Sequence, residues 1–212
     1  MATRQEDVFL NGEGDNWFKR NSHKWPERIT DDPVLEATKD LNPRTVLEIG
    51  CGNGWRLEQY RKRGSGCWGI DPSSEAIING QRLFPGIHLR IGSATRLLPM
   101  AIRFDMVVYG FCLYLCDRDD LFDIVCAGDH AVKEGGHLVI HDFLPDHPHS
   151  TPYHHAKGVL SYKMDYSRLW LANPAYKLIS QIVGIHPFAP NSNDGESVTV
   201  LQKNARNAWP LE

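Results

Sequence analysis

The chain has 212 residues, of which 42% are hydrophobic, and this length is sufficient to bury the core of one α/β domain. A formal net charge of −3 argues against a general nucleic-acid-binding protein, and no apolar run approaches the roughly 20 residues of a membrane-spanning helix. The first seven residues lack the apolar segment of a signal peptide, and the five cysteines lack the paired spacing of a disulfide framework. We therefore expect a cytoplasmic protein that binds no membrane and is a monomer or homodimer.

Residues 1–42 form a polar leader that contains two tryptophans. Two acids and a proline at 31–33 predict the start of a helix before the apolar Val34 and Leu35. From Arg44 onward, strand patterns alternate with helix patterns, which predicts a parallel sheet.

The most informative stretch, residues 46–54, joins an apolar strand, a carboxylate at Glu48 and a turn with three glycines. Such a turn lets the backbone approach a ligand, and the helix predicted from about Trp55 directs its first N–H groups at the same place. Nucleotide-like cofactors bind at such turns, at the carboxyl ends of parallel strands. A dinucleotide fingerprint would have its third glycine where Trp55 stands. Glu48 would repel a pyrophosphate but suits a cationic ligand.

This stretch resembles motif I of the class I S-adenosylmethionine-dependent methyltransferases, whose usual form is hydrophobic-Glu/Asp-x-Gly-x-Gly-x-Gly. The resemblance implies S-adenosylmethionine as cofactor and S-adenosylhomocysteine as product. It also implies that Glu48 helps to orient the methionine end of the site. The turn that would contact that end consists of Gly50, Cys51, Gly52, Asn53 and Gly54.

Two further segments resemble the ribose and adenine parts of the family's site. The second predicted strand ends in Asp71, whose carboxylate can accept from both ribose hydroxyls, and Pro72 begins the next helix. After the third strand the family more often has Gly-Asp-Ala, where the acid accepts from the adenine amino group. The resemblance implies that the adenine is bound here by Ser93, Ala94 and Thr95, with the hydroxyl of Ser93 as a weaker acceptor.

The rest of the chain completes the family's fold. A fourth strand is predicted at residues 104–109, a helix begins near Asp117, and a fifth strand covers 136–141. Strands at 176–183 and 197–201 then form a closing hairpin around the turn-rich residues 189–195. The expected architecture is a Rossmann-like, mostly parallel sheet of seven strands in the order 3-2-1-4-5-7-6, with strand 7 antiparallel and helices on both faces.

We expect a single domain in four parts. The leader is a helical lid, and the next part binds the cofactor. An insert rich in His, Pro and Tyr then forms the acceptor site, and the hairpin and a tail close the fold. These parts span residues 1–42, 43–143, 144–175 and 176–212.

Transfer of a methyl group from a sulfonium is an in-line displacement, so the protein must position the acceptor and, for a hydroxyl or ammonium, remove its proton. His141, at the end of the fifth strand, is the first candidate for the general base, followed by His154 or His155. The alternative is that these histidines are strand-end or solvated residues without a chemical role. No metal is expected, because adjacent histidines point apart on regular structure and Asp142 lacks a carboxylate partner.

Tyr109 and Phe111 follow the fourth strand, in a segment that the resemblance places beside the transferring methyl group. Both are expected as walls of the site, and Tyr109 also as a catalytic residue; packing alone is an equal alternative. Leaders of this kind often cover the cofactor in the family. Trp17 is then expected to cover the site and Arg20 to pair with the methionine carboxylate, the alternative being a surface helix anchored by its aromatic side chains.

These expectations combine into methyl transfer to an oxygen or nitrogen of a small molecule, of sugar or natural-product type, because no added recognition domain is visible. Nucleic acid is not expected as a partner. Residues 109–112 lack the Asn/Asp-Pro-Pro-Tyr common in enzymes that methylate base amino groups, and the basic residues are interpreted as a solvated helix face (Arg56, Arg61, Lys62 and Arg63). Three alternatives stay open: a methyltransferase for a protein side chain or RNA, a non-catalytic cofactor-binding family member, and a nicotinamide oxidoreductase.

Overall fold

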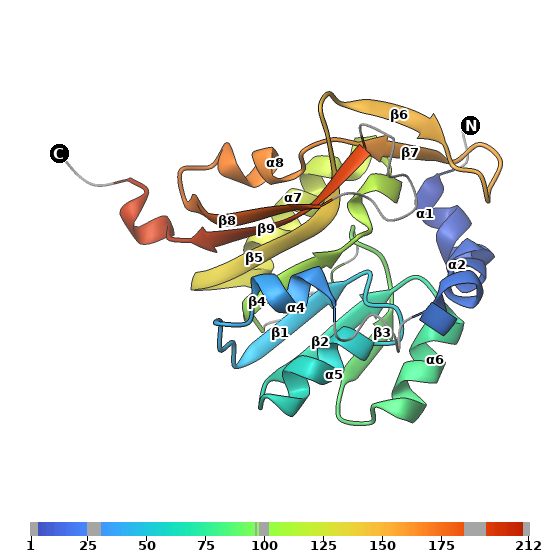
Figure 1. The fold of residues 1–212 in the computed structure, drawn as a ribbon, viewed down its shortest axis with the longest axis horizontal. Coiled ribbons are helices and arrows are strands. Elements are labelled where there is room, and N and C mark those ends of the chain that lie inside the picture. Colours follow the sequence, from blue (N-terminus) through green and yellow to red (C-terminus); the bar gives the residue numbers. More distant parts are fainter. Residues whose placement is uncertain (1–3, 25–30, 96, 98–101, 185–193, 210–212) are drawn as a thin grey trace.

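A computed structural model describes residues 4–24, 31–95, 97, 102–184 and 194–209. Its centre is a seven-stranded sheet in the order β3-β2-β1-β4-β5-β9-β8, in which β9 is antiparallel to both of its neighbours (Figure 1). This confirms the sheet expected from the sequence, with β8 and β9 as the sixth and seventh strands. The strands are β1 (Thr45–Ile49), β2 (Gly66–Asp71), β3 (His88–Ile91), β4 (Phe104–Gly110), β5 (Val132–Pro145), β8 (Tyr176–Gly184) and β9 (Asp194–Lys203).

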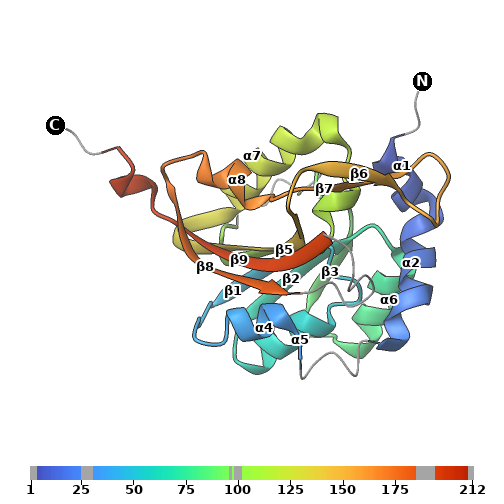
Figure 2. The same cartoon turned by 45° about the horizontal axis from the view of Figure 1, so that its top comes forward.

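Helices cover both faces of this sheet. Figure 2 shows α4, α5 and α6 on one side and α7 and α8 on the other. The helices are α1 (Gln5–Val8), α2 (Gly14–Asn21), α4 (Pro33–Ala37), α5 (Trp55–Lys62), α6 (Ser74–Leu83), α7 (Leu121–Ala131) and α8 (Ser167–Leu171). Shorter helical turns are η1 (Phe9–Glu13), η2 (Ser22–Lys24), η3 (Leu113–Leu115), η4 (Arg118–Asp120) and η5 (Ala205–Asn207).

The central strands read as continuous apolar runs because both of their faces are buried. On β1, Val46 belongs to the core beneath α4 and α5, whereas Leu47 belongs to the core beneath α7 and α8. Met106 and Val107 on β4 alternate between the same two cores. The carboxyl ends of β1 to β4 are thereby held at one edge, where a ligand can be bound.

The leader packs against that edge. Asp15 on α2 accepts hydrogen bonds from the hydroxyl of Ser73 at 2.7 Å and from the backbone N–H of Glu75 at 3.0 Å, which joins α2 to the start of α6. A separate two-stranded hairpin of β6 (His149–Pro152) and β7 (Leu160–Lys163) lies on the other side of the leader (Figure 1). The sequence does not predict this hairpin, because His, Ser and Pro give no alternating pattern.

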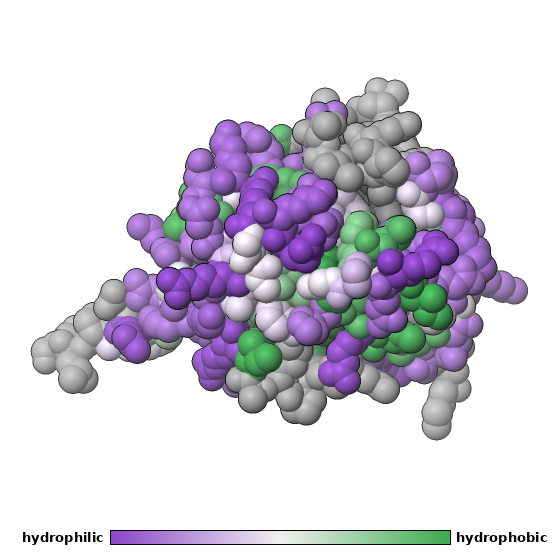
Figure 3. Space-filling model, turned by 90° about the horizontal axis from the view of Figure 1, so that it is seen from below, coloured by the Kyte–Doolittle hydropathy of each residue, from purple (hydrophilic) through white to green (hydrophobic). Residues whose placement is uncertain are grey.

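The surface seen from below in Figure 3 is mostly hydrophilic, with hydrophobic residues gathered in small areas. Among the helices of the described ranges, none combines the length and apolar character required to cross a membrane. The turn-rich residues 189–195 lie largely outside the described part of the chain, so the shape predicted for that turn is not described.

Candidate active site

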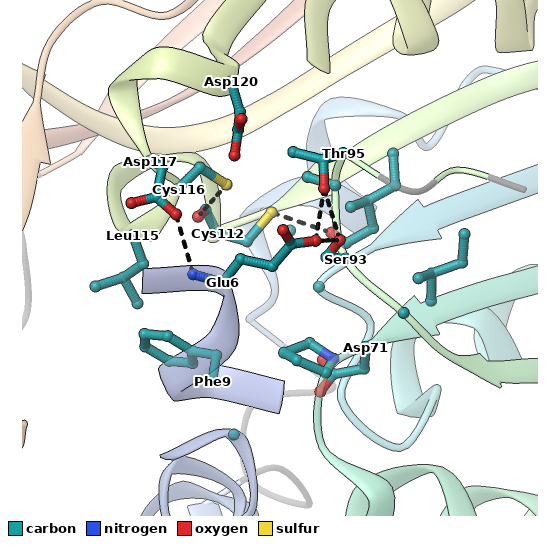
Figure 4. A pocket seen from close by; sticks show the side chains of 18 of the residues that line it. Glu6, Phe9, Asp71, Ser93, Thr95, Cys112, Leu115, Cys116, Asp117 and Asp120 are labelled. Carbon is teal, nitrogen blue, oxygen red and sulfur yellow. Dashed lines mark hydrogen bonds between the residues drawn. The ribbon is translucent and has the colours of Figure 1, made fainter. Parts of the chain in front are cut away.

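A pocket opens where the carboxyl ends of β1, β2, β3 and β4 meet the leader (Figure 4). Open α/β sheets bind their ligands at this edge. Some predicted contact residues do line the pocket, namely Trp17, Gly50, Asp71, Pro72, Ser93, Ala94, Thr95 and Phe111. Its lining also includes four carboxylates but, among the described residues, no Lys, Arg or His; the acids are Glu6, Asp71, Asp117 and Asp120.

The glycine turn has the conformation that its sequence requires. Gly50, Gly52 and Gly54 have φ angles of 73°, 56° and 81°, in the left-handed region that other residues rarely adopt. A Cβ atom on Gly50 would lie 2.8 Å from the Cβ of Cys112, so only glycine fits there. Of this turn, Gly50 lines the pocket. Cys51, Gly52, Asn53 and Gly54 lie behind the lining, where the side chain of Asn53 is bonded to Asn79.

Asp71 connects the glycine turn to the next helix. Its Oδ2 accepts from the N–H of Gly52 at 2.8 Å, and its Oδ1 accepts from the N–H of Ser73 at 2.9 Å. Burial raises the pKa of Asp71 to about 6, although the two backbone hydrogen bonds oppose this rise. Each carboxylate oxygen keeps a lone pair for a further donor, such as a hydroxyl of a ligand.

At the end of β3 the leader adds a carboxylate that the sequence did not reveal. The hydroxyls of Ser93 and Thr95 both donate to Oε1 of Glu6, from Thr95 at 2.6 Å, and all three residues line the pocket (Figure 4). Glu6 precedes Ser93 by 87 positions. In the sequence, the serine at position 93 is the one signal that a carboxylate comes from elsewhere.

Phe111, immediately after β4, has a φ of 60°, and no other non-glycine residue in the described part of the chain has a positive φ. This conformation is costly for a bulky residue and is retained where surrounding contacts enforce it. The Phe111 N–H donates to the carbonyl of His141 at 2.8 Å, and its ring packs 5.0 Å from Phe143 and 5.2 Å from Tyr114. Phe111 therefore forms an aromatic wall of the pocket, and its contact with cofactor or acceptor stays a prediction.

Tyr109 lies in the core and not in the pocket. Its side chain is fully buried, its hydroxyl donates to the carbonyl of Ile124 at 3.1 Å, and its ring packs against Trp170. Alternation along β4 turns Tyr109 toward α7, away from the ligand edge. The expected catalytic and cofactor-contact roles of Tyr109 are therefore replaced by a role in packing.

His141 lies beside the pocket without lining it. Its ring is 5.0 Å from the ring of Phe111, and Nε2 is 3.9 Å from a carboxylate oxygen of Glu196. Neither ring nitrogen has a hydrogen-bond partner among the described residues. Phe111 rather than His141 contacts the pocket space.

The other candidate bases are more distant. His154 and His155 are exposed in the loop between β6 and β7 and do not line the pocket. Asp142 accepts from the backbone N–H groups of Leu113 and Tyr114 and so holds the turn after β4; burial raises its pKa to about 7. Within the described ranges, no group of three or more His, Cys, Asp or Glu side chains could hold a metal.

Glu48 lies in a buried ion network behind the pocket. Arg56 pairs with Glu48 and, through Nη2, with Asp32 at 2.9 Å. Burial raises the pKa of Glu48 to about 7, although Arg56 opposes this; at Asp32 the same guanidinium outweighs burial and lowers the pKa. Arg56 is thus buried, which corrects its interpretation as part of a solvated helix face. Glu48 itself does not line the pocket, so the role expected for it at the methionine end stays a prediction.

The leader contributes to the pocket through different residues from those expected. Trp17 and Phe9 line it, but Arg20 does not. Arg20 instead pairs with Glu13 and donates to the hydroxyl of Tyr153 at 3.2 Å, which joins the leader to the β6–β7 loop. This position does not support a direct ion pair between Arg20 and a methionine carboxylate in the pocket.

The comparison with known proteins agrees with the fold and the glycine-turn pocket. Residues 46–136 match the family described as a methyltransferase domain. The structure is similar to a 1,6-didemethyltoxoflavin-N1-methyltransferase from Burkholderia thailandensis solved with S-adenosylhomocysteine, with a TM-score of 0.76, 16% identity, and coverage of 96% of this chain and 92% of that one. It also resembles an S-adenosylmethionine-dependent methyltransferase from Mesorhizobium loti, with a TM-score of 0.57, 16% identity, and coverage of 85% and 97%. At these identities the likeness concerns the fold.

The matched domain and the fold support a class I S-adenosylmethionine-dependent methyltransferase, with S-adenosylmethionine as its cofactor. Among curated proteins, it is 35% identical over 133 residues to a tRNA U34 carboxymethyltransferase from Vibrio parahaemolyticus and 31% identical over 131 residues to the protein of that name from Pseudoalteromonas translucida. Each match covers 57% of this chain but 37% of the relative.

These relatives contradict the expectation that nucleic acid is not a partner. The expectation rested on a net charge of −3, which is a sum over the whole chain and carries no information about a local surface. It rested also on the absence of the Asn/Asp-Pro-Pro-Tyr motif at residues 109–112, but this motif is typical only of enzymes that methylate base amino groups. Neither observation excludes an RNA acceptor.

Proposed function

We propose that the protein transfers the methyl group of S-adenosylmethionine to a nucleoside of an RNA, with tRNA as the first candidate. The observation that carries this proposal is the similarity, over 57% of this chain, to enzymes named for tRNA modification. That similarity spans little more than a third of each relative, so the acceptor is a proposal about this chain. A cytosolic location is proposed with it and is compatible with five unpaired cysteines.

The order of the strands supports one direction for the cofactor. Gly50 lies at the end of β1, Asp71 at the end of β2, and Ser93 after β3. S-adenosylmethionine is built in the order methionine, ribose, adenine. We assign the ribose to Asp71 because its carboxylate is the middle group and matches a pair of hydroxyls. The methionine then lies toward the glycine turn and β4, and the adenine toward Ser93 and Ala94.

The charge of the pocket supports a methyl group rather than a carboxymethyl group as the group transferred. The lining has four acidic side chains and, among the residues described, no basic one. A sulfonium cation is favoured in such a field, whereas a carboxylate attached to the transferred carbon would have no cationic partner among the lining residues that the structure describes. In this respect we expect the protein to differ from relatives that are named carboxymethyltransferases.

Aromatic side chains support a flat acceptor. Trp17 and Phe9 from the leader face the pocket together with Phe111, which follows β4. A nucleobase taken out of its stack is commonly held between such side chains. Beside them, the β6–β7 loop contacts the leader through Tyr153 and exposes His154, His155 and Lys157, which can donate hydrogen bonds to phosphates. The insert at 144–175 and the leader thus form the two sides of the proposed acceptor site.

The test is transfer of labelled methyl groups from S-adenosylmethionine to total tRNA and ribosomal RNA, followed by digestion to nucleosides and mass analysis. The expected product is a nucleoside heavier by one methyl group. Asp71→Ala should lose the activity, and the exposed Asp40→Ala provides a matched control that should retain it. Labelling of small metabolites with none on RNA would overturn the acceptor, and a carboxymethyl adduct would overturn the assignment of the transferred group.

A further inference from the structure

We infer that Glu6 on the leader recognises the adenine amino group of the cofactor, in place of an acid at position 93. This rests on the proposed orientation of the cofactor, with its adenine at the end of β3. The inference gives the leader a specific task, because a residue outside the strand-and-turn core would then decide which base the pocket accepts.

The hydrogen bonds at the end of β3 leave the carboxylate as the acceptor. Ser93 and Thr95 both donate their hydroxyl hydrogens to Oε1 of Glu6. Their hydrogens are thereby committed, and the negative charge at this edge of the pocket is that of Glu6. A carboxylate has about four lone-pair sites and accepts more strongly than a hydroxyl. The exocyclic amino group of adenine is a donor, so its chemistry matches a carboxylate in this position.

Glu6 is held in place by contacts that do not involve its own carboxylate. The carboxylate of Asp117 accepts from the backbone N–H groups of Gln5 at 3.0 Å and Glu6 at 3.1 Å. The side chain of Gln5 donates to the carbonyl of Leu115 at 2.8 Å and accepts from the N–H of Leu160 at 2.7 Å. As a result the Glu6 side chain is only 7% exposed and faces the pocket (Figure 4).

The carboxylate of Glu6 favours a hydrogen-bond donor on the ligand. Arg4 lies 3.4 Å from Oε2 of Glu6, but its side chain is 50% exposed and pairs more closely with Asp120. A buried carboxylate is stabilised by several strong donors. The hydroxyls of Ser93 and Thr95 donate to Glu6, and the amino group of an adenine would add a charge-assisted hydrogen bond to this carboxylate. A base with an acceptor at the same position, such as hypoxanthine, would instead be repelled.

The experiment compares binding of S-adenosylhomocysteine and S-inosylhomocysteine, which differ in the amino group, by calorimetry. The wild-type protein should prefer the adenosyl ligand by about 10- to 100-fold, the range expected for a charge-assisted hydrogen bond. Glu6→Gln keeps the size of the side chain and adds an N–H donor, so it should bind the inosyl ligand better and remove most of this preference. Glu36→Gln, at an exposed glutamate of α4, should leave the preference unchanged.

Three further variants separate recognition from a structural role of Glu6. Glu6→Ala should lose the preference, and adding Ser93→Asp to Glu6→Ala should restore it by returning an acid to the strand end. Ser93→Asp alone should weaken binding, because it places two carboxylates together. A preference for adenine that persists in both Glu6→Gln and Glu6→Ala overturns the inference.

Failure of the inference is distinguishable from failure of the proposed function. A wild-type protein that binds S-adenosylhomocysteine with an adenine preference dependent on Glu6, but methylates no RNA, overturns only the acceptor. Methylation of RNA together with a preference independent of Glu6 overturns only the inference. A wild-type protein that binds neither ligand overturns the orientation of the cofactor and the inference together.

Discussion

Asp71 should make cofactor affinity depend on pH. Burial raises the pKa of Asp71 to about 6 from an ordinary value of 3.8, so the carboxylate is partly protonated in mildly acidic solution. The two ribose hydroxyls proposed to bind Asp71 would donate to the ionised form and lower its pKa. A group whose pKa falls on binding releases a proton. Affinity is therefore expected to be reduced below pH 6, to rise with pH, and to level off above it.

The size of the change in cofactor affinity follows from the shift in the pKa of Asp71. If the cofactor returns the pKa of Asp71 to its ordinary value, the difference of about 2 pKa units corresponds to about 3 kcal/mol, or about 100-fold in affinity at the acidic limit. Part of the pH range over which Asp71 titrates lies below pH 5, so the change in affinity between pH 5 and pH 7 is about tenfold. A smaller observed change would mean that the ribose hydroxyls stabilise the anion less than water does in the unfolded chain.

Calorimetric titration of S-adenosylhomocysteine at several pH values measures this directly. Asp71→Asn cannot titrate, so it should bind more weakly at pH 7 and lose the change between pH 5 and 7. Asp105→Asn, at an acid on β4 away from the pocket, controls for removal of a carboxylate. The reasoning is refuted if wild-type affinity is flat over this range, or if Asp71→Asn shows the same dependence as the wild type.

Three further predictions concern residues around the site. Tyr109→Phe should lower the free energy of unfolding by about 1 kcal/mol through one lost buried hydrogen bond while leaving cofactor affinity unchanged, as urea unfolding and calorimetry would check; weakened binding would return Tyr109 to the site. Arg56→Ala should lower the free energy of unfolding by about 3–5 kcal/mol, because it leaves the buried carboxylates of Asp32 and Glu48 without their cation. Arg61→Ala, at an exposed ion pair, should lower it by under about 1 kcal/mol in the same urea experiment, and similar losses for both variants would contradict the ion network. Because Phe111 has a positive φ, the Phe111→Gly variant should be more stable than Phe111→Ala by about 1–2 kcal/mol. At Phe122, on the exposed face of α7, the Ala variant should instead be more stable than the Gly variant. Thermal unfolding of the four variants tests this, and a more stable Ala variant at both positions would contradict the strain argument.

The cofactor half of the site was predictable because its signals are local. The strand that ends at Asp71 and the glycines of the turn are short sequence patterns whose geometry follows from backbone chemistry. Sheet order could be inferred for a similar reason, since a right-handed strand–helix–strand unit allows few arrangements. That Trp17 lines the pocket could be expected only from the resemblance to a family, not from its own pattern.

The positions that were predicted wrongly or missed are determined by which face of a strand a side chain occupies and by contacts between residues distant in the sequence. Tyr109 and Phe111 are two positions apart, yet the chain turns at Phe111, so the even spacing that normally puts two side chains on one face does not apply. Glu6 reaches Ser93 across 87 positions, and Arg56 reaches Asp32 across 24. Contacts of this kind have no periodicity in the sequence. They are set by how the leader and α4 pack on the finished sheet.

Hydrogen bonds from Asp117 and Gln5 tie α1 to the loop after β4 and to the start of β7. Bonds of this kind break and re-form with water at a small net cost, so α1 can detach without unfolding the core. If the cofactor binds beneath Glu6 as proposed, its release would include the opening of α1.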